Sequence, residues 1–528
     1  MNEEQIWILV VLIVYMICMV AMGFFFSRKK LTNAQYVLGG RKLNPWVTAM
    51  SAQASDMSGW LLTGLPGLAY LTAVAQRNGQ EAVYTALGLL IGTGLNWLFT
   101  ARRLRLYTEI SSDSLTVPSY LNNRFKDKHN IIRMIAALVI CVFFTVYAAS
   151  MFSASAKLFN SIFGLDYMIG LIIGVVIIVA YVMLGGFLAV SWTDMIQGLL
   201  MFFALIIVPF VCLGNIGAVG GDFAGAGKLL ADAFNIFDFV GSEKIGWVTV
   251  ATGLGWGLGY FGMPHINTRF MAIRSEKEVK PAMIIAMIWV TITLVCAVII
   301  GVLGNAIVPG LTDSENVFSQ VVMKIFPGAI SGILMAAVLA AIMSTADSQL
   351  LVASSSVSND VYAIIKESIT KEKCKDKELM VVSRITVFVL ALIGFFLAID
   401  PNSSVFELVS YACGGLGATF GPIMLFSLYS KSLNKFGAIA SMGTGAVTTI
   451  VFKYGLSHLG GFWEIYEIIP GFILATAVLF IVSICTKNFV KVEDKLAMDS
   501  EFAEMLRRLK GGDDNGAPAV ETAENVEE

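Results

Sequence analysis

Long apolar runs recur along the whole chain and are separated by short polar segments. A run of about 20 apolar residues is long enough for one helix to cross a bilayer. We therefore expect an all-α polytopic membrane protein with thirteen transmembrane helices, numbered here as spans 1 to 13. Their predicted positions are near 6–26, 45–70, 82–101, 131–159, 168–187, 194–214, 247–273, 281–308, 328–358, 379–399, 404–428, 434–456 and 465–486.

The composition supports a membrane protein. Of the 528 residues, 57% are hydrophobic and only 14% are charged, whereas soluble domains carry about 25% charged residues. The net charge of −2 gives no reason to expect a nucleic-acid partner. The seven cysteines are scattered without metal-ligand spacing, so we interpret them as small buried apolar residues. The only partner that composition itself implies is the lipid bilayer, and the oligomeric state stays open.

The charged loops predict an orientation in the cell membrane. With thirteen spans, every basic cluster falls on one side, near 28–42, 102–133, 269–280, 366–377, 431–435 and 487–495. Basic loops face the cytoplasm, so the N-terminus is expected outside and the C-terminus inside. The opposite loops carry acids, at Asp166, Asp222, Asp232, Asp238, Glu243, Asp313, Glu315 and Asp400. Beyond residue 510 the acidic sequence predicts a disordered tail.

Span 2 contains a stretch that does not suit a plain membrane helix, SAQASDMSGWLLTGLPG at 51–67. A central Asp such as Asp56 costs about 2.5–3.5 kcal/mol in a membrane helix, so it should face a polar cavity. Gly59, Gly64, Pro66 and Gly67 weaken the helix around it. A carboxylate beside a helix break indicates an ion or substrate site at mid-membrane.

Span 7 contains a second weak stretch, ATGLGWGLGYFGMP at 251–264. Its five glycines suit either close helix packing or an unwound segment, and the following proline favours unwinding. Spans 2 and 7 are five helices apart, so spans 2–6 and 7–11 would be inverted repeats around a central transport site. The expected units are 1–44 (leading helix and inner loop), 45–245 and 246–430 (the repeats), 431–490 (two trailing helices) and 491–528 (cytoplasmic acidic tail).

Span 9 places small and hydroxyl-bearing residues on one face between Ala341 and Ser348. Such hydroxyls often bond only the carbonyl four residues earlier. Alternatively, they bind Na⁺, a hard cation that prefers oxygen ligands, together with carbonyls freed at the break in span 2. The predicted Na⁺ ligands are Ala54, Met57, Ala341, Ser344 and Thr345.

Three charged residues have two interpretations each. Asp56 either supports the ion site without ligating the ion, by attracting the cation, or caps the helix at the break. Asp194 either serves an inner ion pathway or N-caps span 6. Arg41 either lines an inner gate or anchors a loop at the membrane surface.

Aromatic residues beside the two breaks are candidates for a substrate pocket, namely Trp60, Tyr147, Trp256 and Tyr260, with Pro264 next to them. Helix amides exposed after Asp56 would suit a substrate carboxylate. Trp256 and Tyr260 would cover a small apolar ring or side chain.

Five motifs resemble those of the sodium:solute symporter family, in particular its bacterial sodium/proline symporters. They are SAQASDMSGWLLTGLPG, GGFLAVSWTD, GWGLGYFGMPHI, AAIMSTADSQLLVASS and YEIIPGF, and the likeness extends to about residue 490. The resemblance implies a LeuT-type five-plus-five inverted repeat with one leading and two trailing helices. It also implies symport, that is, Na⁺-coupled uptake of L-proline with Na⁺ as the co-transported ion, and no enzyme activity.

The resemblance also implies roles for individual residues. It places Na⁺ on the five ligands predicted above and assigns importance in coupling to Asp56, Asp194 and Arg41. It places proline on Ser58, Gly59, Trp60, Tyr147, Trp256, Tyr260 and Pro264. The sequence departs from the family at 345–347, where Asp347 replaces a serine and adds a carboxylate of open function.

Other interpretations remain. A family member could carry a sugar, pantothenate or a short carboxylate instead of proline. A cation channel would require rings of acids or a re-entrant filter, and the sequence displays neither. The spans contain no Ser/His/Asp, HExxH or paired-Asp arrangement typical of an enzyme.

Overall fold

The structure is a computed structural model that describes residues 1–27, 32–74, 79–184, 186–235 and 246–510. The basic residues at 28–30, the acids Asp238 and Glu243, and the predicted disordered tail beyond residue 510 lie outside this described part. All named secondary-structure elements in these ranges are helices, as the hydrophobic pattern predicts.

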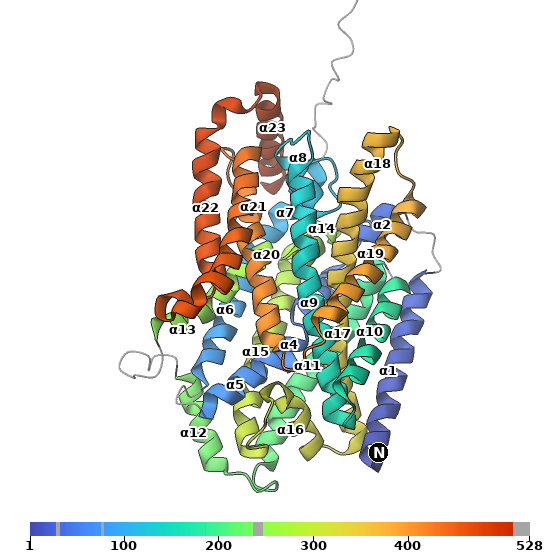
Figure 1. Cartoon of the computed structure of the whole chain (residues 1–528), viewed down its shortest axis with the longest axis vertical. Coiled ribbons are helices and arrows are strands. Elements are labelled where there is room, and N and C mark those ends of the chain that lie inside the picture. Colours follow the sequence, from blue (N-terminus) through green and yellow to red (C-terminus); the bar gives the residue numbers. More distant parts are fainter. Residues whose placement is uncertain (28–31, 75–78, 185, 236–245, 511–528) are drawn as a thin grey trace, which may run out of the picture.

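Ten helices in the described ranges are long and apolar enough to cross a membrane, and they run roughly along the long axis of the molecule (Figure 1). They comprise α1 (Glu3–Ser27), α6 (Gln80–Asn96) with α7 (Arg102–Ile110), α9 (Ile131–Phe163), α11 (Phe187–Asn215), α15 (Val279–Ile307), α17 (Gly328–Ser356) with α18 (Ala363–Thr370), α19 (Asp376–Leu397), α20 (Val405–Ser427), α21 (Lys435–Ile450) and α22 (Ile468–Cys485). The shorter α10 (Tyr167–Leu184) is also apolar.

Two further predicted spans are interrupted, which is why they are absent from the ten. Span 2 is divided into α3 (Pro45–Asp56), α4 (Gly59–Leu62) and α5 (Gly64–Val74). Span 7 is divided into α13 (Trp247–Gly255), the 3₁₀ helix η2 (Trp256–Gly262) and α14 (Pro264–Ala272). The count of thirteen crossings stays a prediction, but both interruptions fall within the stretches singled out in the sequence.

Loop helices mark the inverted relation between the two halves. In the first half, α8 (Val117–Arg124) follows the third span, and in the second half α16 (Val317–Ile325) follows the eighth. These two helices lie at opposite ends of the molecule in Figure 1. A repeat with an odd number of crossings reverses its direction in the next copy, so its equivalent loops must lie at opposite ends.

The interrupted segments lie inside the bundle. The α3 helix packs against α11, α14, α15 and α17, and η2 packs against α6 and α20. All residues of α3 from Val47 to Asp56 are buried, including five with polar side chains. In a bilayer such residues belong in the protein interior, so this core is where a polar site is built.

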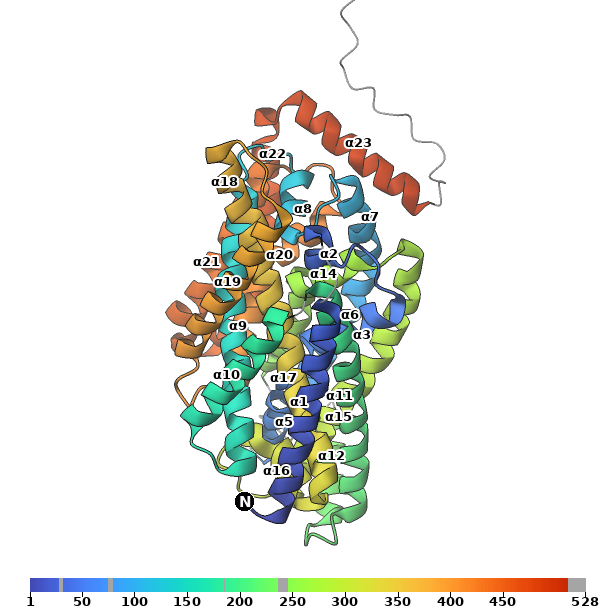
Figure 2. The same cartoon turned by 90° about the vertical axis from the view of Figure 1, so that its right-hand side faces the viewer.

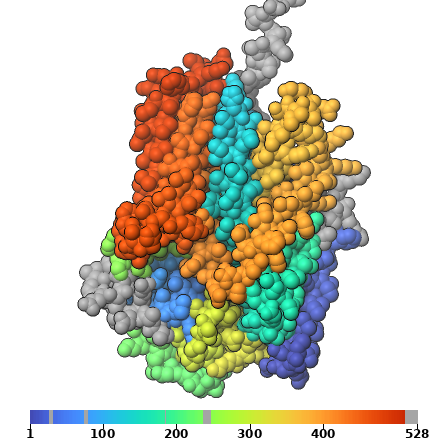
Figure 3. Space-filling model, viewed as in Figure 1, coloured from blue at the N-terminus to red at the C-terminus, as the bar shows by residue number. Residues whose placement is uncertain are grey.

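The C-terminal part of the chain ends in α23 (Val492–Leu509), which crosses the end of the bundle near α7 (Figure 2). Figure 3 shows the orange and red C-terminal helices lying beside the cyan segment of α9 on this face of the molecule. Met498, Phe502 and Met505 are the buried residues of α23. Lys128 Nζ lies 3.2 Å from Asp494 Oδ1 on the same helix. The sequence interpretation included these residues in an acidic tail and did not identify the helix.

Candidate functional site

The chain leaves helical geometry directly after Asp56. Met57 ends α3 with φ −76° and ψ 71°, and its amide donates to the Gln53 carbonyl over 2.7 Å. Ser58 is extended and its hydroxyl accepts from the Trp60 amide as the N-cap of α4. Asp56 therefore does not cap the break: Ser58 does, and that alternative was wrong.

The glycines of span 7 fit neither simple alternative alone. Residues 256–262 wind as a 3₁₀ helix, which is tighter than an α-helix and not unwound. A Cβ added to Gly257 would lie 2.3 Å from the Gly88 carbonyl oxygen, and one on Gly262 would lie 2.6 Å from that of Leu416. The stretch thus changes its winding and packs with backbone contact against α6 and α20, so the expectation of an unwound segment is corrected.

Oxygens of α3 and α17 meet at the first break. The Ser344 hydroxyl donates to the Ala54 carbonyl over 2.7 Å, and the Thr345 hydroxyl lies 3.4 Å from the same oxygen. The Ser344 hydroxyl is also 3.2 Å from the Ala341 carbonyl. Four of the five predicted Na⁺ ligands are therefore adjacent, while Met57 lies one turn beyond Ala54 at the end of α3. A group of neutral oxygens from two helices suits a hard cation.

A small cavity lies beside these oxygens, between the two breaks. It is lined by Asp56, Trp60, Leu89, Trp256, Tyr260, Met263 and Cys413. The indoles of Trp60 and Trp256 face it with ring centroids 6.2 Å apart. The Trp60 indole nitrogen donates to the Asp56 carbonyl over 3.2 Å, which fixes the ring across the break.

The other predicted substrate residues, Ser58, Gly59, Tyr147 and Pro264, do not line the cavity. The Tyr147 hydroxyl lies 3.3 Å from the Asp56 carbonyl and 3.4 Å from the Ser58 hydroxyl. Gly59 allows close packing, since an added Cβ would lie 3.1 Å from Ile342 Cγ1. Pro264 starts α14 at its first position, where its missing amide hydrogen has no cost.

Sequence reasoning missed several residues of this region. Met263 and His265 flank Pro264 at the second break, so their position in the sequence could have identified them as candidate site residues. Leu89 and Cys413 lie on the continuous helices α6 and α20, where nothing in the local pattern distinguishes them.

A second polar cluster joins four helices, at the middle of α3 and the C-terminal half of α14. Arg269 Nη2 lies 3.1 Å from Asp194 Oδ2, and the Ser51 hydroxyl donates to the same carboxylate oxygen over 2.6 Å. Arg269 also donates to the hydroxyls of Ser51 and Ser348. Asp194 does not N-cap its helix, because α11 begins at Phe187 with Gly186 as its cap; that alternative was wrong. Arg269 had been counted only as an inner-loop charge.

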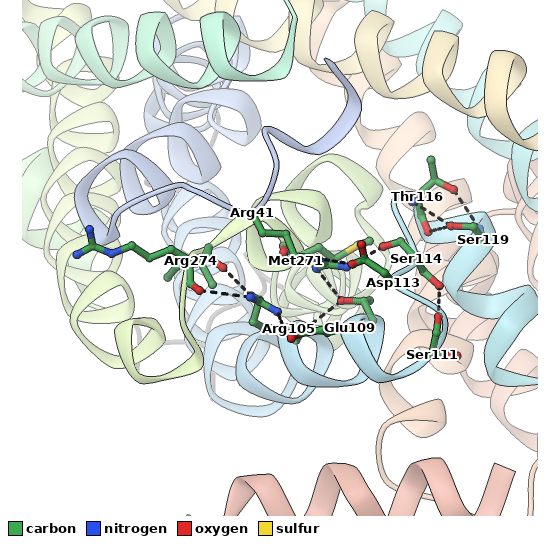
Figure 4. Close-up of polar contacts among 12 residues, drawn as sticks. Arg41, Arg105, Glu109, Ser111, Asp113, Ser114, Thr116, Ser119, Met271 and Arg274 are labelled. Carbon is green, nitrogen blue, oxygen red and sulfur yellow. Dashed lines mark hydrogen bonds and ion pairs between the residues drawn. The ribbon is translucent and has the colours of Figure 1, made fainter. Parts of the chain in front are cut away.

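Arg41 connects the two halves at the same end of the molecule, as Figure 4 shows. Its guanidinium contacts Asp113 at 2.9 Å and the Thr108 hydroxyl at 3.1 Å, both in the first half, and donates to the Met271 carbonyl in the second half over 2.7 Å. Burial, with the neighbouring Arg105 guanidinium, lowers the pKa of Arg41. Arg41 thus does more than anchor a surface loop, since it bridges the segment of Thr108 and Asp113 to the end of α14.

Discontinuous helices at equivalent positions of two inverted halves define a secondary transporter. The model of the sodium:solute symporter family matches residues 36–445. The high-affinity proline transporter PutP of Bacillus subtilis (strain 168) is 44% identical over 474 residues, covering 89% of this chain and 96% of that protein. The osmoregulated proline transporter OpuE of the same organism is 40% identical over 511 residues, covering 96% and 99%.

Other relatives and solved structures agree. The sodium/proline symporter of Staphylococcus aureus (strain JH9) is 40% identical over 487 residues, covering 91% of this chain and 93% of that one. A substrate-bound, outward-open Na⁺-coupled sialic acid symporter has the same fold, with a TM-score of 0.73 at 20% identity, covering 91% and 98%. This chain belongs to the sodium:solute symporter family, and is accordingly a multi-pass membrane transporter coupled to Na⁺ rather than an enzyme.

Proposed function

We propose that this protein takes up L-proline together with Na⁺ by alternating access. The observation that carries the proposal is the adjacency of two chemically different sites at one helix break. The Ala54 carbonyl meets the Ser344 hydroxyl at 2.7 Å, and two residues further on Asp56 lines a cavity with the Trp60 and Trp256 indoles. Relatives named as proline transporters that cover nearly the whole chain support the choice of substrate.

The proposed Na⁺ ligands are the oxygens of Ala54, Met57, Ala341, Ser344 and Thr345. An ion held between α3 and α17 would link the first repeat to the second and fix the end of α3. The substrate cavity begins at that end, so Na⁺ binding would order the residues that contact proline. This shared element provides the coupling, because each ligand favours the same arrangement of α3.

Proline would lie in the aromatic cavity, and Ser58, Gly59, Tyr147 and Pro264, which do not line it, would hold in place the segments that do. The two repeats would then rock around the site to expose it inward. A membrane potential of 100 mV contributes about 2.3 kcal/mol for each charge moved inward. Arg41 and Asp194 would stabilise the inner end while the site is closed to the cytoplasm.

The charges at the two ends of the molecule support an orientation in the membrane. The end with α8, α18 and α23 carries basic residues such as Arg102, Arg103 and Lys366, and the opposite end carries Asp313 and Glu315. By the positive-inside rule the first end faces the cytoplasm. The N-terminus would then be outside the cell and the C-terminus inside.

Uptake of labelled L-proline into proteoliposomes tests the function. An inward Na⁺ gradient is expected to drive accumulation, and an inside-negative potential to increase it. Uptake at the same rate without Na⁺ would contradict the coupling. Competition by sugars, pantothenate and short carboxylates separates the substrates: Na⁺-driven uptake of one of these solutes, without saturable uptake of proline, would contradict the substrate assignment.

A further inference from the structure

The cavity between the two breaks contains polar groups that the protein leaves without partners. Asp56 Oδ2 and the Tyr260 hydroxyl are both buried and form no hydrogen bond of normal geometry within the described residues, although Thr93 and the Asp56 carboxylate lie near the Tyr260 hydroxyl. Both residues line the cavity. An unpaired polar group in the protein interior is costly, so such groups are expected to bind a ligand that enters the cavity.

The rest of the lining does not suit a metal ion. Besides Asp56 and Tyr260, it consists of two indoles, a leucine, a thioether and a thiol. Na⁺ prefers several oxygen ligands, and the oxygens around Ala54 offer these separately. A carboxylate among aromatic faces instead suits an organic ammonium group, which gains both an ion pair and cation–π contact.

We infer that the Asp56 carboxylate binds the secondary ammonium group of the substrate and that the Tyr260 hydroxyl accepts its other N–H. The inference rests on the proposed function and adds an orientation within that site. The substrate's methylene ring would then lie against the indoles of Trp60 and Trp256. Asp56 becomes a substrate-contacting residue, in place of a residue that acts only on the ion.

The geometry also supplies a basis for selectivity. A secondary ammonium has two N–H groups, which match one carboxylate and one hydroxyl. A primary ammonium has a third N–H, which would be left unpaired against indole, leucine and sulfur. Sites built to satisfy particular hydrogen bonds discriminate strongly against ligands that do not match them. The cavity therefore favours cyclic secondary amino acids over linear primary ones.

His265 is a positioning residue in this scheme. Its Nε2 lies 3.8 Å from Asp56 Oδ1, on the opposite side of the carboxylate from the unpaired Oδ2, and its ring packs against Phe144 with centroids 5.5 Å apart. The imidazole thus limits the orientations of the carboxylate. His265→Gln, which retains a polar group at this place, should preserve proline affinity better than His265→Leu.

The first experiment compares L-proline with tetrahydrofuran-2-carboxylate, in which oxygen replaces the ammonium nitrogen. As a competitor of Na⁺-driven proline uptake, the oxygen analogue is expected to bind at least about 100-fold more weakly than proline, because it lacks the charge and both donors. Equal inhibition by the two compounds would overturn the inference while leaving Na⁺-coupled proline uptake intact.

The second experiment separates substrate binding from ion binding. Asp56→Asn should weaken proline binding about 100-fold at saturating Na⁺, whereas Na⁺ binding in the absence of proline, followed by calorimetry, should change less than about threefold. Loss of Na⁺ binding with proline affinity unchanged at saturating Na⁺ would assign Asp56 to the ion and overturn the inference. Asp166→Asn, an exposed carboxylate in an outer loop, is the matched control.

A milder variant guards against failure to fold. Tyr260→Phe removes one oxygen and should weaken proline about tenfold, but tetrahydrofuran-2-carboxylate should be nearly unaffected because it has no N–H to donate. Equal losses for both compounds would mean a general distortion of the cavity and would contradict the hydroxyl's role. Tyr454→Phe, at an exposed tyrosine, is the control. Absence of Na⁺-driven proline uptake in the unmodified protein would instead refute the proposed function itself.

Discussion

The Arg269 guanidinium lies 3.1 Å from the Asp194 carboxylate, and both side chains are completely buried. The two residues come from distant parts of the chain, since Asp194 lies on α11 and Arg269 on α14. Ser51 and Ser348 complete the cluster from α3 and α17. Removing one member of a buried ion pair leaves an uncompensated charge, whereas removing both need not.

We predict that Arg269→Gln destabilises the protein by about 3–5 kcal/mol, since it leaves Asp194 without its charged partner. Adding Asp194→Asn should recover part of this loss. Thermal unfolding of the purified protein in detergent measures both effects, and Na⁺-driven uptake shows whether the recovered fold still functions. If the double variant is less stable than the unmodified protein by the sum of the two single effects, the two residues are not coupled.

Thr345→Ala should raise the Na⁺ concentration needed for half-maximal proline uptake by about tenfold or more. The variant removes a hydroxyl 3.4 Å from the Ala54 carbonyl, and a hydrogen-bonding or ligating oxygen next to a charge is worth about 1.5–3 kcal/mol. Thr345→Ser retains the oxygen and should behave nearly as the unmodified protein. Thr386→Ala, which removes a hydroxyl bonded to the carbonyl four residues earlier on α19, is the control. An unchanged Na⁺ requirement in Thr345→Ala would remove α17 from the ion site.

Local sequence signals predicted the breaks but not all of the partners. Glycine, proline and a carboxylate in apolar surroundings marked the region of Asp56 because each disfavours an ordinary membrane helix. The role of Arg269 was not predicted, because a charge at the end of a span resembles a loop residue. Its partner Asp194 is 75 positions away in the sequence. Leu89 was not predicted, because an apolar residue on an unbroken helix does not differ in its local sequence from a residue that faces lipid.

The last helix shows a signal that was present but not used. Met498, Phe502 and Met505 follow one another at spacings of four and three, the period of an amphipathic helix. The high charge of the surrounding residues led instead to the prediction of a tail. The spacing alone does not say what the apolar face packs against. In the structure, α23 packs against α7.

Gly257→Ala should severely reduce the amount of folded transporter. A Cβ at this position would lie 2.3 Å from the Gly88 carbonyl oxygen and 3.1 Å from Gly92 Cα, both backbone atoms of α6, which cannot move aside as a flexible side chain could. Gly443→Ala is the matched control, because no atom lies within 4 Å of an added Cβ on α21. That change should be neutral or stabilise the protein by up to about 1 kcal/mol, since alanine favours helix. Size-exclusion profiles and thermal unfolding compare the two, and equal behaviour would contradict the close approach of η2 to α6.

Arg41→Gln should reduce the initial rate of proline uptake more than tenfold, whereas Asp113→Asn should reduce it less than about threefold. The Arg41 side chain is largely buried and also donates to the Thr108 hydroxyl and to the Met271 and Ser114 carbonyls. Asp113 is 69% exposed, and an exposed ion pair contributes only about 0–1 kcal/mol. Arg41→Lys should be intermediate, because an ammonium keeps the charge but cannot reach the same set of acceptors. Measurements at 50 and 500 mM salt, with Na⁺ held constant, separate the ion pair with Asp113 from the other contacts of Arg41. If Arg41→Gln loses uptake rate in a salt-dependent way and to the same extent as Asp113→Asn, Arg41 acts only as a surface ion pair. A salt-independent loss confined to the arginine variants would instead support its bridge to Met271 as the contact that closes the inner end.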